Sequence, residues 1–116
     1  MPRRQEQVVK QARERIARIR AALNCIDYLC SGTLRQHTKA CGKPDCRCAT
    51  DPAARHGPYY RWGHMKEGKL IHRTVSPEQA AILRRAIANY RKVKKLLKAW
   101  EDETERLMEN EPPRKQ

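Results

Sequence analysis

The chain has 116 residues, and its 26 Lys and Arg against 13 Asp and Glu give a formal net charge of +13. This length fits one domain with a small core, and an aromatic content of 5% without any Phe leaves few large side chains to fill it. No apolar run approaches the roughly 20 residues that cross a bilayer, and the opening MPRRQ does not begin a signal peptide. We therefore expect a cytoplasmic protein that neither spans a membrane nor is secreted.

The first predicted element is an amphipathic helix over residues 3–30, within an N-terminal region of residues 1–31. Pro2 suits a helix start, and Ser31-Gly32 suits a helix end, because glycine readily adopts the left-handed cap conformation. Apolar or small side chains alternate at steps of three and four, which predicts a seam for a second helix. These residues are Val9, Ala12, Ile16, Ile19, Leu23, Ile26 and Cys30.

Short strands are predicted next, in a β module of residues 32–75. Residues 33–38 favour one strand, and residues 59–65 and 69–75 favour a hairpin around Lys66-Glu67-Gly68, where glycine tolerates the turn. The aromatic side chains of Tyr59, Tyr60 and Trp62 support strand structure. They are candidates either for the small core or for stacking on unpaired bases.

The sharpest motif lies inside this module, at residues 41–56, CGKPDCRCATDPAARH. Cys41, Cys46 and Cys48 form a C-x4-C-x-C cluster, and His56 follows closely. Zinc prefers thiolate and imidazole ligands in tetrahedral sets of four, so these residues predict a closed structural zinc site. Such a site would also strengthen a domain that has little core.

Other interpretations of the cysteines remain open. The alternatives are disulfides, free reduced thiols, or an iron–sulfur cluster that recruits Cys25 or Cys30. Cys30 also continues the apolar seam of the first predicted helix. The rivals of His56 for the fourth position are His37, His64 and His72. A catalytic zinc needs a vacant position for water, which four protein ligands would not leave, and we predict no catalytic residues and no enzyme activity.

The last predicted element is a long helix over residues 76–110, followed by a disordered tail of residues 111–116. Ser76-Pro77-Glu78-Gln79 has the pattern of a capping box with proline in the first turn. Acidic residues crowd the far end of this helix, where the helix dipole disfavours them, so we expect basic partners from the start of the first helix, with a separate basic molecule as the alternative. The candidate partners are Arg3, Arg4, Lys10 and Arg13. The predicted fold is therefore α+β: a long antiparallel, coiled-coil-like helical hairpin with a small zinc-bound, three-strand module inserted between its helices.

The middle of the chain resembles an uncharacterised family of small prokaryotic proteins. The resemblance rests on a CGKPxCxC motif at residues 41–48, HGPYY at residues 56–60 and an IANYR-type stretch at residues 87–91, and it extends over roughly residues 32–98. It implies a zinc-binding-like module in prokaryotes, often in mobile-element settings. It implies no established activity.

The charge distribution favours nucleic acid as the partner. Net charges of +5, +6 and +6 fall on residues 1–20, 35–73 and 74–98, whereas residues 101–116 contain six acidic and three basic residues. A positive surface of this extent is typical of nucleic-acid binding, and the alternative is a solvated helix surface. The candidate contacts are Lys39, Lys43, Arg47, Arg55, Arg61, Lys66, Lys69, Arg73, Arg84, Arg85, Arg91, Lys92 and Lys95, with Lys94 and Lys98 extending the surface.

Two functions follow as hypotheses. The first is a zinc-stabilised nucleic-acid-binding protein, an accessory factor of a mobile-element or nucleoprotein system, with DNA slightly favoured over RNA by the resemblance. The second is a helical assembly subunit that forms a homodimer or docks on a larger protein through its seam, with the zinc module only structural.

Overall fold

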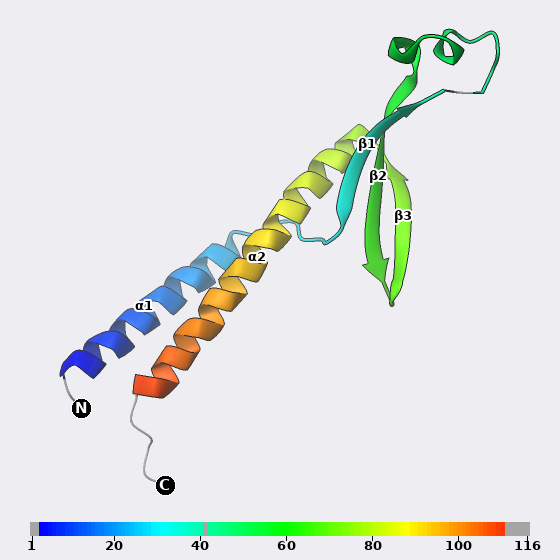
Figure 1. The fold of residues 1–116 in the computed structure, drawn as a ribbon. Helices are drawn as coiled ribbons and strands as arrows, with labels where there is room; N and C mark the ends of the chain where they lie inside the picture. Colours follow the sequence, from blue (N-terminus) through cyan, green and yellow to red (C-terminus); the bar gives the residue numbers. More distant parts are fainter. Residues whose placement is uncertain (1–2, 41, 111–116) are drawn as a thin grey trace. The chain divides into compact units, whose positions relative to one another are not determined.

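The computed structural model describes residues 3–40 and 42–110 (Figure 1). One helix precedes and one helix follows three strands and two short 3-10 helices in the sequence, so the fold is α+β as predicted. The elements are α1 (Arg3–Asn24), β1 (Thr33–Lys39), η1 (Arg47–Ala49), η2 (Pro52–Ala54), β2 (His56–Lys66), β3 (Lys69–Val75) and α2 (Pro77–Asn110). The expected disordered tail, residues 111–116, lies outside the described residues.

Helix α1 ends at Asn24, so the prediction of a helix through residue 30 was wrong at its end. Contacts with α2 replace the missing helical turns. The backbone N–H of Cys30 donates to the carbonyl of Ala86 at 3.4 Å, and the side chain of Asn89 donates to the carboxylate of Asp27 at 3.1 Å. Ile26 and Cys30 therefore leave the predicted seam, whose buried members are Ala12 and Ile19.

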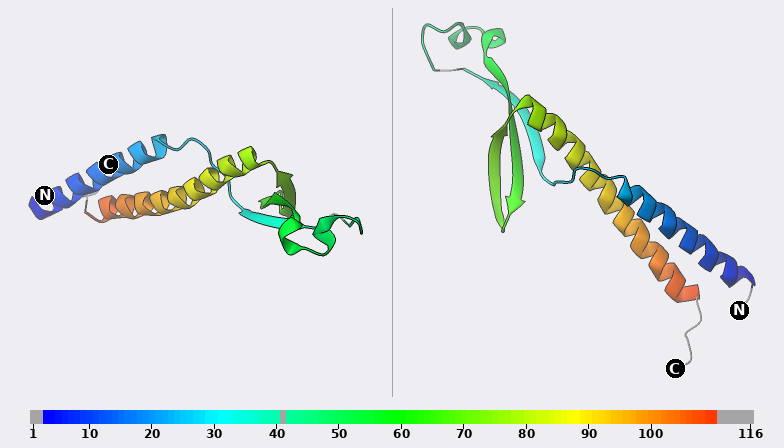
Figure 2. Two further views of the ribbon diagram at one scale, coloured as in Figure 1. Left: turned by 90° about the horizontal axis from the view of Figure 1, so that it is seen from above. Right: turned by 180° about the vertical axis from the view of Figure 1, so that it is seen from behind.

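The three strands form one antiparallel sheet in the order β1-β2-β3 (Figures 1 and 2). Strand β2 starts at His56, three residues before the predicted strand, because its first residues also pair with β1. The hairpin between β2 and β3 turns through Glu67 and Gly68, with φ values of 52° and 80°. Positive φ at both central residues is the signature of a type I′ turn, whose twist matches that of paired strands.

Alternation along the strands divides the aromatic residues between two faces. We call the face that contains Tyr60 and Trp62 the covered face, because both share it with the buried Val75 and contact residues from outside the sheet. The indole of Trp62 donates to the Ser31 carbonyl at 3.0 Å, and the Arg84 guanidinium lies 5.2 Å from the Tyr60 ring centre. Tyr60 and Trp62 are therefore structural.

The opposite side, which we call the open face, carries Tyr59 and Arg61 on β2. Register places Thr33, Arg35 and His37 of β1 beside Gly63, Arg61 and Tyr59 respectively, and His72 of β3 lies opposite Gly63. The arginine and histidine side chains on this face are exposed. The small module therefore has one face that packs and one that is available for contact.

Helix α2 begins with the predicted capping box. The backbone N–H of Gln79 donates to the Ser76 hydroxyl at 3.1 Å, and the Ser76 backbone N–H donates to the Gln79 side-chain oxygen at 2.9 Å. Two N–H groups that have no partner within the helix are satisfied in this way. Ala80, Ala86 and Ile87 are buried along the first turns.

The chain divides into two compact units, residues 28–88 and residues 1–27 with 89–116. In the second unit Glu103 is only 8% exposed and accepts two hydrogen bonds from Arg106, at 2.8 and 3.0 Å. Arg15 of α1 also reaches Glu103, at 3.5 Å. An acidic residue of α2 thus has a basic partner from α1, and that partner is a residue outside the predicted set.

Neither helix in residues 3–40 and 42–110 is long and apolar enough to cross a membrane.

Candidate metal centre

The loop between β1 and β2 is built from successive tight turns. The Cys46 N–H donates to the Lys43 carbonyl at 3.1 Å, which closes a β-turn with Pro44 at its second position, where proline is favoured. Helix η1 follows at once, and the Asp51 carboxylate then caps η2 by accepting from the Ala53 N–H at 3.0 Å. These local bonds fix the path of the chain between the cysteines and His56.

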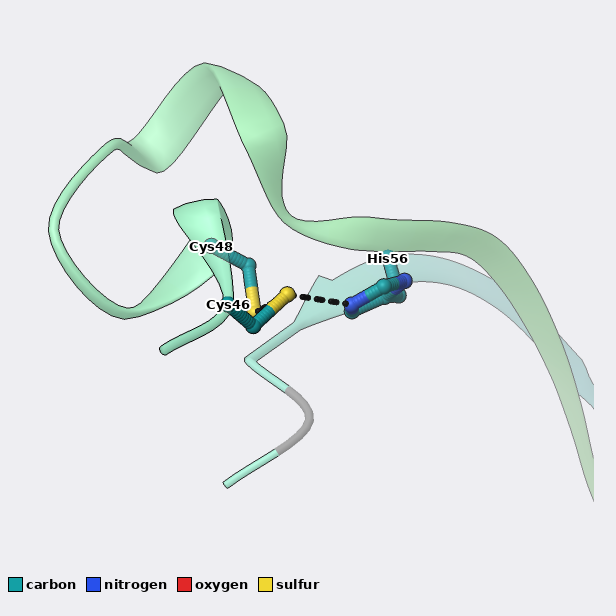
Figure 3. A group of neighbouring side chains, drawn as sticks. All are labelled: Cys46, Cys48 and His56. Carbon is teal, nitrogen blue, oxygen red and sulfur yellow. Dashed lines mark hydrogen bonds between the residues drawn. The ribbon is translucent and has the colours of Figure 1, made fainter. Parts of the chain in front are cut away.

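Three predicted ligands meet in this loop (Figure 3). The Cys46 sulfur lies 3.3 Å from Nε2 of His56 and 3.2 Å from the Cys48 sulfur. Cys48 is 4% exposed, whereas His56 is exposed at the start of β2. The two sulfurs and the ring nitrogen lie within 4.8 Å of one another, so these residues could hold a metal ion.

The fourth predicted ligand, Cys41, lies outside the described residues. The rival histidines lie elsewhere on the sheet. His64 stacks on Trp62 with ring centres 3.7 Å apart, and His37 lies 5.8 Å from the Tyr59 ring, while His72 belongs to the open face. Among the residues that the structure describes, His56 is therefore the histidine that joins the cysteine cluster.

The two cysteines of the first predicted helix also stay apart from the cluster. Cys25 is an exposed free thiol just after α1, and Cys30 is a half-buried free thiol. Burial raises the pKa of the Cys30 thiol, which favours its protonated form. Neither residue belongs to the candidate metal group in the described part of the chain.

The predicted basic contacts are distributed over several elements. Arg61, Lys66, Lys69 and Arg73 are exposed on the β2–β3 hairpin, and Lys39, Lys43, Arg47 and Arg55 are exposed around the metal loop. Arg47 pairs with Asp51 at 3.7 Å, and Arg84 is engaged with Tyr60. Exposed residues of α2 continue the basic surface: Arg85, Arg91, Lys92, Lys94, Lys95 and Lys98.

Register reveals a basic residue that the sequence argument missed. Arg35 of β1 lies directly opposite Arg61 of β2. Like charges in this position repel one another, because their Cβ atoms are only about 5 Å apart. No ion pair joins either arginine to an acidic residue within the described ranges. Alternation in the predicted strand 33–38 was the available signal, since it places Thr33, Arg35 and His37 on one face.

A hollow of about 690 Å³ lies over this part of the open face. Arg35, His37, Arg61 and His72 contribute to its lining. Gly63 lines the hollow without a side chain, and an added Cβ there would lie 3.0 Å from the His72 ring.

The chain belongs to the family described as Domain of unknown function (DUF6788), whose family model matches residues 5–85. This agrees with the expectation of an uncharacterised family, and the match begins within α1 rather than near residue 32. No curated protein and no solved structure gives a significant match.

Proposed function

We propose that this member of the DUF6788 family is a zinc-stabilised nucleic-acid-binding protein. The observation that carries the proposal is the pair Arg35 and Arg61, which face one another on the open face without acidic partners among the described residues. An anion bound between two adjacent guanidinium groups would offset their mutual repulsion, and phosphate fits their planar donors. The unit that contains them, residues 28–88, has eleven basic and four acidic residues, a net charge of +7.

Structural zinc is the metal that the ligand set favours. A tetrahedral zinc bound to thiolate and imidazole has ligand–ligand separations of about 3.6–3.8 Å. The 3.2 and 3.3 Å separations among Cys48, Cys46 and His56 need only a small expansion to reach these values. In the proposal Cys41 completes the set, and the site closes the loop between β1 and β2.

The zinc proposal is tested by Cys46→Ser, with Cys25→Ser as a matched control outside the cluster. Loss of one thiolate should release the metal and unfold the loop, because binding energy at a structural site is folding energy. Metal analysis should give about one zinc per chain for the control and far less for Cys46→Ser. Equal zinc content and equal melting temperature in both variants would refute the site.

The position of His56 is tested separately, by His56→Ala against His72→Ala. We expect zinc affinity to fall in the first variant and to stay unchanged in the second. The reverse result would move the fourth ligand to the open face.

Nucleic-acid binding is tested by a salt titration with labelled DNA and RNA. If six to ten phosphates are neutralised, affinity should fall by about 10³–10⁵ between 50 and 200 mM salt. A flat dependence, or no binding at 50 mM salt, would remove the proposed function. The accessory role in a mobile-element or nucleoprotein system is part of the proposal, with DNA slightly favoured over RNA. It rests on the sequence resemblance, and the proposed role is binding rather than catalysis.

The proposal includes an antiparallel helical hairpin of α1 and α2. The contact from Arg15 to Glu103 and the bond between Asp27 and Asn89 support this arrangement, because Asp27, which follows α1, pairs with an earlier residue of α2 than Arg15 does. A disulfide engineered between Ala12 and Leu107, both buried, would test it. Failure to form this crosslink in an otherwise folded chain would contradict the hairpin.

Helical assembly is the second candidate, because α2 carries a partly exposed apolar surface. Leu97 is 45% exposed and Met108 is 68% exposed, and with Trp100 they line a hollow of about 470 Å³ edged by Glu101 and Glu105. Burying these side chains against another chain would be favourable. A stable homodimer in light scattering, together with no binding to nucleic acid, would favour this function over the first.

A further inference from the structure

The open face of the sheet combines features that suit unpaired nucleotides. We propose that it binds a single-stranded segment of nucleic acid, with Arg35 and Arg61 on a phosphate and Tyr59 beneath a base. This inference rests on the proposed nucleic-acid binding and assigns it to one side of the sheet.

The phosphate position follows from the arginine pair. Because Arg35 and Arg61 occupy directly opposed positions on neighbouring strands, both guanidinium groups can reach one anion above the sheet. The exposed imidazole of His72 lines the same hollow from β3, so a third nitrogen-bearing side chain borders the anion. Gly63 makes room for the His72 ring, which would lie 3.0 Å from a Cβ at that position.

The base position follows from Tyr59. It precedes Arg61 by two residues on β2, so the two side chains emerge on the same face about 6.7 Å apart along the strand. The His37 ring lies 5.8 Å from the Tyr59 ring, and the Lys39 ammonium lies 5.0 Å from its centre. An aromatic ring thus lies next to the phosphate position, with a further cation beside it.

The adjacent ring favours a single strand over a duplex. Bases in a duplex are stacked on one another and paired, so their faces are not available to a protein ring, whereas unpaired bases stack readily on aromatic side chains. A duplex would use the arginine pair alone and leave Tyr59 without a role. The covered face is less suited to a base, because the Trp62 ring is stacked on His64 with ring centres 3.7 Å apart and its indole N–H donates to the Ser31 carbonyl.

The test compares short single-stranded DNA, single-stranded RNA and duplex DNA of the same mixed sequence by fluorescence anisotropy, with the full zinc-loaded chain. The variants are Arg35→Gln, Arg61→Gln, the double variant of both, and Tyr59→Leu. Arg20→Gln is the control, since it removes the same charge from an exposed residue of α1 that is not among the candidate contacts. Circular dichroism and zinc content identify any variant that fails to fold.

We expect single strands to bind about tenfold more tightly than the duplex. Arg35→Gln and Arg61→Gln should each weaken binding, and the double variant should reduce the slope of log affinity against log salt by about 0.7, because the pair together neutralises one phosphate of a single strand. Tyr59→Leu should weaken binding by about tenfold without changing that slope, because base stacking is not ionic. Arg20→Gln should leave the affinity and the slope nearly unchanged.

Two outcomes would overturn the inference while the proposed function stands. One is duplex binding as tight as single-strand binding. The other is an Arg20→Gln effect as large as that of Arg61→Gln, which would place the contact elsewhere. Absence of binding to all three oligonucleotides at 50 mM salt would instead refute the proposed function itself. Comparison of the DNA and RNA strands then shows which backbone the site prefers.

Discussion

The two faces of the three-stranded sheet use similar residue types for opposite purposes. On the covered face an arginine and aromatic rings contact one another and the main chain, as in the pairs Arg84 with Tyr60 and Trp62 with Ser31. On the open face two arginines face each other, and an imidazole and a lysine surround Tyr59. The two faces therefore differ in the contacts that their side chains make rather than in the types of residue they carry.

The largest expected difference between the faces is in stability, when Trp62→Ala is compared with Tyr59→Ala. Removing the half-buried Trp62 deletes its bond to Ser31 and its contact with His64, so we expect a loss of about 2–3 kcal/mol. Tyr59→Ala should cost under about 1 kcal/mol, since its neighbours are exposed. Denaturant unfolding of the zinc-loaded chain measures the free energy of unfolding of both variants. Equal losses would show that the two faces do not differ in their contribution to stability.

Gly32 and Gly68 both have positive φ but should differ in how well they tolerate a side chain. At Gly32 (φ 116°) a Cβ would lie 2.3 Å from the Gly63 carbonyl oxygen and 2.8 Å from the Trp62 indole nitrogen, so Gly32→Ala forces main chain to shift. We expect a loss of about 2–3 kcal/mol. Gly68→Ala, in open space at the hairpin turn, should cost about 1 kcal/mol from its backbone conformation alone. Thermal unfolding checks the order, and a larger effect at Gly68 would contradict the close approach at Gly32.

On the open face, one substitution should raise the stability of the fold rather than lower it. Arg61→Gln removes the repulsion from Arg35 and should stabilise the fold by about 0.2–1 kcal/mol at low salt, while binding weakens. Screening should abolish this gain in concentrated salt. The control Arg20→Gln should change stability little, and destabilisation by Arg61→Gln would show that the arginine has a structural partner.

The smallest expected effect is a difference in thiol reactivity. Burial raises the pKa of Cys30, so at any pH below that value its thiolate should be scarcer than the thiolate of the exposed Cys25. Alkylation followed by mass mapping should modify Cys25 first. Because the folded pKa is raised, the associated stabilisation is complete below the ordinary thiol pKa and is lost as pH rises through the raised value. Faster alkylation of Cys30 would contradict its burial.

Local chemistry made much of the fold predictable from the sequence. The Ser76–Gln79 capping box and the Glu67-Gly68 turn depend on residues that are close in the chain, and both form as expected. The spacing of Cys46, Cys48 and His56 likewise anticipated the group that the structure brings together.

Features that depend on distant partners could not be predicted in the same way. Periodicity predicted a first helix through Cys30, but the helix ends at Asn24, and the residues after it contact Ala86 and Asn89 of α2 instead. The importance of Arg35 emerges only when the register places it opposite Arg61. The division of Tyr59 from Tyr60 and Trp62 needed knowledge of which face of the sheet contacts residues outside it.

The order of strands in the sheet has a kinetic consequence. Strands β2 and β3 are joined by two residues, whereas β1 reaches β2 only by closing the 16 residues from 40 to 55. By loop length alone, that closure costs about 1.8 kcal/mol more in chain entropy. Strand β1 should therefore be the last to join the sheet and the first to leave it. Since β1 carries Arg35, partial unfolding would disassemble the arginine pair while the hairpin persists, and amide exchange should be fastest along β1.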